Sequence, residues 1–284
     1  EDGATTTNSQ MLYDIVRKLD DSCEVEIISN NGKILTLRAN DSRFSLACLP
    51  KEDFPIIDQK NNGASIKINS NVLFKLIDKT RFAISNEETR YFLNGLYFNV
   101  VEENNTTNLT LVGTDGHRLA KSSYILEKKI DQLTGVIIPK KTINELSKLL
   151  SDLDQDIEII VSSTKIIFFI GNLVFVSKLI DGTFPDYKRV IPKDNINSLE
   201  VNRNSLLSAV DRVSTIANDK SPVIKFKILK GIINLNTVNN DNSTATEDLN
   251  LNYDGDEIEI GFNSKYIMDI VNNLEDEIVT LNLK

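Results

Sequence analysis

The chain has 284 residues, of which 40% are hydrophobic and 26% are charged, and its formal net charge at pH 7 is −9. This composition is that of an ordinary globular protein of two or three domains. It contains no apolar run of the roughly 18 residues that a membrane-spanning helix requires, and it lacks the overall positive charge that is common among nucleic-acid-binding proteins.

Cysteine and histidine are too scarce to build most metal or catalytic sites. Cys23 and Cys48 belong to no CxxC motif, and His117 is the only histidine. This set is too small for the Cys and His ligands of a structural zinc site, and no serine lies in a GxSxG motif. We therefore expect two free thiols in a reducing cytoplasm, no metal, no cofactor and no catalytic residue.

Five segments are predicted to contain helices of about three turns. Along the chain they are 7–19, 66–85, 139–150, 199–217 and 262–274. The prediction is clearest in the second segment, where five residues recur on one face at the helical period. These residues are Leu73, Leu76, Ile77, Thr80 and Ile84.

Runs of β-branched residues predict strands after the first and third helices. The predicted strands are 25–28, 34–37, 157–161, 166–170 and 173–177. Stretches rich in Asn and Asp predict a domain linker at 58–63 and surface hairpin loops at Asn104-Asn105 and at 239–248. Helices followed by several short strands indicate an α+β fold.

The same pattern of residues occurs more than once in the chain. Residues 66–79 match residues 199–212 at seven positions, each displaced by 133 residues, so that Asn69 corresponds to Asn202. A second module around Asp14 occurs again around Glu145 and Asp269. The repeats predict the second half of one domain at 1–63, a whole domain at 64–193 and a C-terminally incomplete domain at 194–284, so both ends are expected to be cut.

Positive charge is concentrated in the predicted helices. The formal charges of the five segments sum to +6, which leaves −15 for the rest of the chain. Such helices indicate a shared inner surface that faces a polyanion, with acidic sheets outside; chance clustering in five short windows is the alternative. The cations that offer diffuse, sequence-independent phosphate contacts are Lys75, Lys79, Arg81, Lys140, Lys141 and Lys148.

Three short motifs follow one another between residues 91 and 192. They are YFLNGL at 91–96, TDGHRLA at 114–120 and FPDYKRVIP at 184–192. The second contains an Asp-Gly turn after an apolar run, which predicts a hairpin, and two prolines stiffen the third. In this order, the three motifs resemble those in the middle domain of the bacterial DNA polymerase III beta subunit family, the sliding clamps.

This resemblance implies repeated clamp domains of α+β class, each with two helices inside and antiparallel sheets outside. Such domains form a ring of two identical subunits around duplex DNA. The implied function is that of a non-catalytic, cytoplasmic processivity factor in DNA replication, which binds double-stranded DNA without sequence preference and tethers the replicative polymerase to it.

The resemblance also implies a hydrophobic groove for short linear motifs of the polymerase, the clamp loader and repair proteins. Apolar side chains would form its walls, and polar groups would orient a peptide that carries Gln, Leu and Phe-type side chains. The matching residues are Leu93, Thr114, Gly116, His117, Arg118, Leu119, Pro185, Arg189 and Val190.

Two further sites follow from the resemblance. Arg90, Tyr91 and Phe92 match a loop that contacts DNA, where aromatic rings stack on unpaired bases, although aromatic residues that open a strand are more often core residues. Phe92 stands where the family has a second tyrosine. The dimer interface is expected at Phe44 and Leu46 on one subunit and at Thr215 and Ile216 on the other, with plain core packing as the alternative.

Two other functions remain open from the sequence alone. One is an enzyme that uses Asp115, His117 and Asp186 as an acid/base or metal cluster. The other is a repeat scaffold that binds proteins only.

Overall fold

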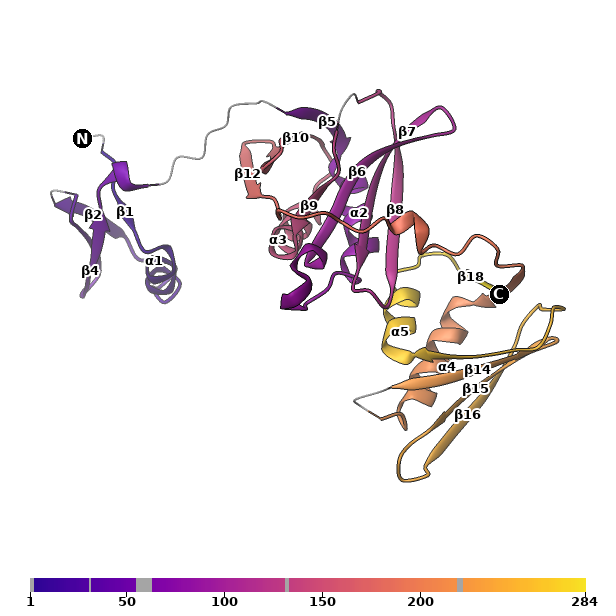
Figure 1. Ribbon diagram of the computed structural model, residues 1–284. Coiled ribbons are helices and arrows are strands. Elements are labelled where there is room, and N and C mark those ends of the chain that lie inside the picture. Colours follow the sequence, from indigo (N-terminus) through magenta and orange to yellow (C-terminus); the bar gives the residue numbers. More distant parts are fainter. Residues whose placement is uncertain (1–2, 31, 55–62, 131–132, 219–221) are drawn as a thin grey trace. The chain divides into compact units, whose positions relative to one another are not determined.

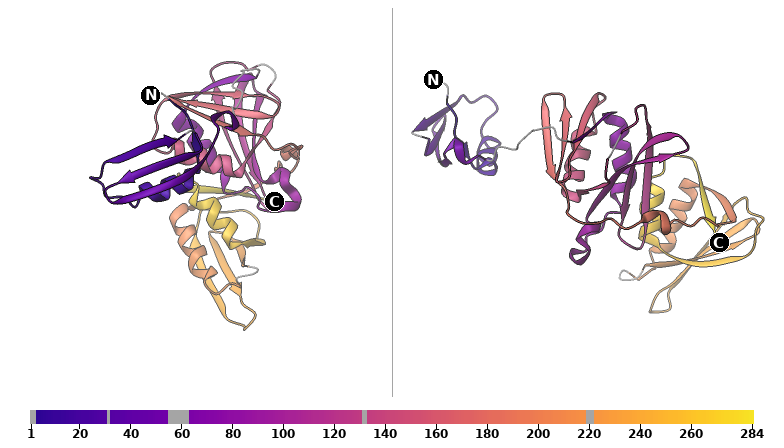
Figure 2. Two further views of the ribbon diagram at one scale, coloured as in Figure 1. Left: turned by 90° about the vertical axis from the view of Figure 1, so that its left-hand side faces the viewer. Right: turned by 45° about the horizontal axis from the view of Figure 1, so that its top comes forward.

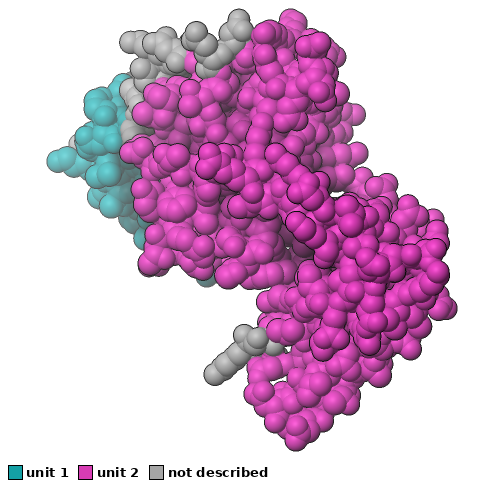
Figure 3. Space-filling view, turned by 45° about the vertical axis from the view of Figure 1, so that its right-hand side comes forward, with its two compact units in different colours: residues 1–60 teal, residues 61–284 magenta. Residues whose placement is uncertain are grey.

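The computed structural model describes residues 3–30, 32–54, 63–130, 133–218 and 222–284 (Figure 1). The chain forms two compact units, Glu1–Lys60 and Asn61–Lys284, which are coloured separately in Figure 3. In the part of the chain that is described, no helix is both long and apolar enough to span a membrane.

The first unit is one helix packed on one antiparallel sheet. Its elements are β1 (Thr6–Thr7), α1 (Ser9–Val16), β2 (Val25–Asn30), β3 (Ile34–Ala39), β4 (Ser42–Leu49) and a short 3-10 turn, η1 (Lys51–Asp53). The strand order is β1-β4-β3-β2. Leu35, Leu37 and Leu46 form its small core, against which Leu12 and Ile15 of α1 pack.

The second unit begins with a central segment that runs from β5 to η3. Its elements are β5 (Ala64–Asn69), α2 (Ser70–Arg81), η2 (Glu88–Leu93), β6 (Gly95–Glu103), β7 (Thr106–Thr114), β8 (Leu119–Leu126), β9 (Val136–Pro139), α3 (Lys140–Leu150), β10 (Asp156–Val161), β11 (Lys165–Ile170), β12 (Leu173–Lys178) and η3 (Tyr187–Arg189). Two antiparallel sheets, β12-β11-β10-β5 and β8-β7-β6-β9, share one hydrophobic core with α2 and α3.

A C-terminal segment from β13 to β18 follows in the same unit, as the views in Figure 2 show. Its elements are β13 (Asn197–Asn202), α4 (Arg203–Ser214), β14 (Val223–Leu229), β15 (Ile232–Val238), β16 (Thr244–Asn250), β17 (Ile258–Asn263), α5 (Ser264–Asn272) and β18 (Ile278–Leu283). The strands form the sheets β16-β15-β14-β17 and β13-β18, and this segment has a core of its own.

The two segments repeat one plan, as the sequence predicted. β13 and α4 begin and end 133 residues after β5 and α2. In both segments the strand before each helix pairs with the sheet of the other half: β5 with β10, β9 with β6, β13 with β18 and β17 with β14. The α+β class with repeated domains is therefore confirmed.

Asparagine side chains start four of the five α-helices. Asn8, Asn69, Asn202 and Asn263 each accept a hydrogen bond from a backbone N–H in the first turn of the helix that follows. Such a cap satisfies a donor that has no partner inside the helix. Pro139 precedes α3 and makes no side-chain cap bond.

The helix predictions were wrong at their starts. Segments 66–85 and 199–217 each join a strand to a helix, because alternating residues such as Ile66 and Ile68 point inward from β5 before the helical period begins. Tyr91 and Phe92 open no strand, since they lie in the 3-10 helix η2. With the observed bounds, only α2 and α3 keep a formal charge of +2, while α1 carries −1 because Arg17 and Lys18 follow it.

The predicted loops were partly correct. Asn104 and Asn105 form the β6–β7 turn with positive φ angles of 51° and 62°, as a tight hairpin requires. The predicted loop 239–248 is shorter, because β16 already begins at Thr244. Most of the predicted linker at 58–63 lies outside the described residues.

Candidate functional site

A groove of about 920 Å³ opens on the central segment, between η2, the β7–β8 turn and the chain around η3. Nine of its lining residues are apolar or aromatic: Phe92, Leu93, Leu119, Phe184, Pro185, Tyr187, Val190, Ile191 and Pro192. The others are Arg90, Thr114, Gly116, His117, Arg118, Lys121 and Asp186. Such a surface, mostly apolar with a few polar groups at its edge, is typical of ligand and peptide sites.

The structure brings eight of the nine residues predicted for a groove around this one cavity. They are Leu93, Thr114, Gly116, His117, Arg118, Leu119, Pro185 and Val190. The ninth, Arg189, does not line it; its side chain is 85% exposed and pairs with Asp186 at 2.9 Å.

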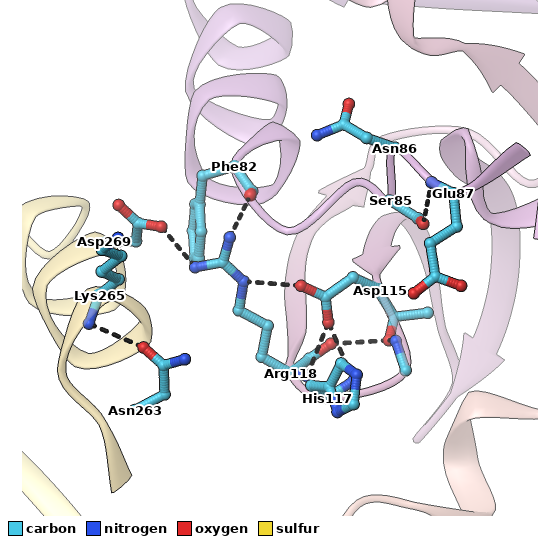
Figure 4. A network of polar contacts seen from close by, with 12 residues as sticks. Phe82, Ser85, Asn86, Glu87, Asp115, His117, Arg118, Asn263, Lys265 and Asp269 are labelled. Atoms are coloured by element: carbon cyan, nitrogen blue, oxygen red, sulfur yellow. Dashed lines mark hydrogen bonds and ion pairs between the residues drawn. The ribbon is translucent and has the colours of Figure 1, made fainter. Parts of the chain in front are cut away.

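The β7–β8 turn is held by its own side chains. The Asp115 carboxylate accepts hydrogen bonds from the backbone N–H groups of His117 and Arg118, at 2.9 and 3.0 Å (Figure 4). The Thr114 hydroxyl accepts from the backbone N–H of Gly116 and donates to the carbonyl of Arg118. The turn therefore presents His117 and Arg118 to the groove in a fixed geometry.

Gly116 is required by both conformation and space. Its φ is +88°, in the region that glycine adopts most easily, and a Cβ there would lie 2.4 Å from Nη1 of Arg90. The Arg90 side chain thus passes directly over the turn. Arg90 Nε also donates to Glu87 at 2.8 Å, and this hydrogen bond lowers the pKa of the Glu87 carboxyl.

Aromatic stacking forms the base of the groove. The rings of Tyr97 and Phe184 are parallel, with centroids 4.7 Å apart. Phe184 and Tyr187 are buried in one cluster with Leu93 and Val112. This packing fixes the start of the FPDYKRVIP motif against the sheet, while Val190 and Ile191 remain exposed.

The groove residues that the prediction missed lie mostly inside the motifs that it used. Phe184, Asp186, Tyr187, Ile191 and Pro192 belong to the same nine-residue stretch as Pro185 and Val190. Lys121 follows Leu119 by two positions on β8, so the alternation of a strand places both on one side. Arg90 and Phe92, which the sequence assigned to DNA contact, also line the groove.

The other residues predicted to contact DNA lie on α2, on α3 and in η2. Lys75 and Lys141 are exposed, and Tyr91 is 54% exposed. Lys79 pairs with Glu275 at 3.6 Å. Lys140 donates to Asn86 Oδ1 at 2.6 Å, and burial, with a smaller contribution from Arg118, lowers the pKa of its amine.

The residues predicted for a dimer interface differ in exposure. Leu46 is buried in the core of the first unit, where Phe44 packs beside it. Thr215 is exposed at the end of α4, and Ile216 is half-buried. These positions are compatible with core packing for Leu46, and the interface stays a prediction.

The acid/base cluster of the enzyme alternative is occupied by structural contacts. Asp115 binds the turn and Arg118, and Asp186 pairs with Arg189. The described residues contain no group of three or more His, Cys, Asp or Glu side chains placed to hold a metal ion. Cys23 and Cys48 are free and half-buried.

Comparison with known proteins covers nearly the whole chain. The N-terminal, central and C-terminal domains of the DNA polymerase III beta subunit match residues 1–58, 67–186 and 188–284. The chain is similar to the beta sliding clamp of Caulobacter vibrioides, with 42% identity over 269 residues, 94% of this chain and 72% of that protein. It is 34% identical to the Escherichia coli K12 beta sliding clamp over 283 residues, 100% of this chain and 76% of that one.

Solved structures agree. A crystal structure of the Bartonella birtlesii sliding clamp bound to griselimycin superimposes with a TM-score of 0.93 at 44% identity, covering 100% of this chain and 76% of that one. The chain therefore belongs to the family of the DNA polymerase III beta subunit, the non-catalytic processivity factor known as the beta sliding clamp.

Proposed function

We propose that the chain works in the cytoplasm as one subunit of a two-subunit ring that encircles duplex DNA and tethers the replicative polymerase through the groove on the central segment. The observation that carries this proposal is the groove itself: two motifs 70 residues apart, TDGHRLA and FPDYKRVIP, meet around one largely apolar cavity. The arrangement into three domains, 1–63, 64–193 and 194–284, is part of the proposal and is supported by the 133-residue repeat.

The proposed occupant of the groove is a short linear motif with Leu and Phe-type side chains and a Gln. Leu119, Pro185 and Val190 offer apolar contacts, and His117 and Arg118 offer polar groups at the edge. A peptide of this kind binds by placing apolar anchors in such a cavity. A related clamp from Caulobacter crescentus, 40% identical, has been solved with polyethylene glycol bound at a proposed tethering region for the beta-motif.

The proposed DNA contacts come from the exposed lysines of α2 and α3, Lys75 and Lys141 among them. Lysine presents a point charge to phosphate and no fork for a base edge, so binding should not depend on sequence. A ring that encloses DNA needs no tight contact, which is compatible with a net charge of −9. Phe44, Leu46, Thr215 and Ile216 are the residues proposed to join the two subunits.

Peptide binding to the groove tests this proposal. We expect a fluorescent peptide with Gln, Leu and Phe to bind the purified chain, and Leu119→Ala to weaken it by about tenfold, since truncation of a buried apolar contact costs roughly 1 to 3 kcal/mol. Fluorescence anisotropy measures the dissociation constants. Leu173→Ala, which removes a similarly exposed side chain on the edge strand β12, is the matched control and should leave binding unchanged.

Two results would decide against the groove. Either the wild-type chain fails to bind the peptide, or both leucine variants weaken it equally. A scaffold that binds only proteins would bind the peptide but would not remain on primed circular DNA, so retention on circular and release from linear DNA separates that alternative from a clamp.

A further inference from the structure

Arg118 connects the groove to a helix of the C-terminal segment. Its Nη1 donates to Asp269 Oδ2 on α5 at 2.5 Å, although the two residues are 151 positions apart in sequence (Figure 4). Arg118 lines the groove, whereas Asp269 is not among the described residues that line it. Asp269 can therefore influence a bound peptide only through a neighbour.

The Arg118 guanidinium is held on several sides. Nε donates to Asp115 at 3.2 Å, and Nη2 donates to the carbonyl of Phe82 at 2.9 Å. The rings of Phe82 and Tyr266 lie 5.3 and 4.5 Å from its Cζ, and only 13% of the side chain is exposed. The planar fork of arginine can reach these three acceptors at once, which a lysine amine cannot do.

The residue before Arg118 also contacts α5. The His117 ring stacks on the ring of Tyr266, with centroids 6.3 Å apart and an angle of 24° between the planes. Two consecutive groove residues thus rest on the same helix. A third link, from Lys79 on α2 to Glu275 just after α5, lies nearby in sequence to both elements.

We propose that Asp269 is a positioning residue for the groove: it holds the Arg118 guanidinium, and through it the β7–β8 turn, in the geometry that a peptide needs. This inference rests on the peptide-binding function proposed above. Without the carboxylate, Arg118 loses one charged acceptor, and its side chain must be ordered at the expense of binding. By linkage, a bound peptide must in turn strengthen the contact between Arg118 and α5.

The test is the Asp269→Asn variant of the full chain with the same fluorescent peptide. We expect the dissociation constant to rise by about fivefold or more, the lower end of typical coupling between sites. Asp269→Glu keeps the carboxylate and should restore part of the affinity. Asp276→Asn makes the same change in charge at an exposed position after α5 and should leave affinity unchanged.

A double-mutant cycle identifies the route. We expect Asp269→Asn to add nothing in an Arg118→Ala background, because the partner through which it acts is gone. We also expect the peptide to slow hydrogen exchange in α5 of the wild type and not of Asp269→Asn, a readout that a general loss of stability would not produce. Additive effects, or identical exchange in both proteins, would overturn the inference.

The outcomes for the two proposals can be told apart. If the wild type binds the peptide and Asp269→Asn binds it equally well, the groove stands and the positioning role is wrong. If the wild type does not bind the peptide, both are wrong.

Discussion

At the scale of single residues, two neighbours set the conformation of the β7–β8 turn. Asp115 accepts two backbone N–H groups that the hairpin leaves without partners, and Gly116 takes a φ of +88°. The pair was recognisable as a turn in the sequence, because both effects are local. What the sequence did not indicate is the close approach of Arg90 to Gly116, which comes from η2.

Replacing Gly116 should therefore affect more than backbone strain. In Gly116→Ala the left-handed conformation costs roughly 1 to 2 kcal/mol of stability, and the added methyl group must also displace the end of the Arg90 side chain from the groove. We expect lower stability in urea denaturation together with weaker peptide binding.

Gly231→Ala provides the matched control. Gly231 has a φ of +75°, and a Cβ there would meet no atom within 4 Å. This variant should lose a similar amount of stability and keep its affinity for the peptide. Equal losses of affinity in the two variants would show that strain alone, and not Arg90, explains the effect.

At the scale of elements, the chain uses one β-α unit several times. Asparagine before each of α1, α2, α4 and α5 accepts a backbone N–H of the first turn, and the first strand crosses to the other half of its domain. The cap at Asn202 accepts from Ser205 N at 3.0 Å. This local bond fixes the boundary between β13 and α4, which the apolar pattern alone did not resolve.

Removal of this cap should destabilise the C-terminal segment. Asn202→Ala is expected to lower the free energy of unfolding by about 1 kcal/mol, because a helix N–H loses its acceptor. Asn204→Ala, two positions later and exposed in α4, is the control and should be neutral or slightly stabilising, since alanine is the better helix former. Urea denaturation of both variants measures the difference, and equal destabilisation would contradict the capping role.

The elements were predictable because strands and helices follow short-range patterns. Strand segments such as 157–161 and 166–170 were found from β-branched residues and coincide with β10 and β11 to within a residue. The error at 66–85 arose because the period changes from two to 3.6 inside one apolar stretch, at Asn69.

At the scale of the whole molecule, charge separates the two helices of the central segment from the rest. With a net charge of −9 on the chain, α2 and α3 each carry +2. Phosphate contacts through these helices should release counterions, so retention on DNA should fall as salt rises.

A pair of substitutions tests these contacts. The double variant Lys75→Ala/Lys141→Ala should leave circular primed DNA faster than the wild type, and the slope of its retention against salt should be smaller by about 2, one for each lost phosphate contact. Lys230→Ala is the control, because Lys230 lies in the β14–β15 turn and pairs with Asp254. An unchanged slope in the double variant would rule out Lys75 and Lys141 as phosphate contacts.

The sequence by itself determined the fold class, the repeat and the motifs around the groove, because each depends on local periodicity or on residues within nine positions of one another. Tertiary structure alone decided that Arg90 and Phe92 face the groove and that Arg118 reaches Asp269, 151 residues away. Contacts of this range depend on how two separately folded cores pack side by side, and no pattern along the chain records that packing.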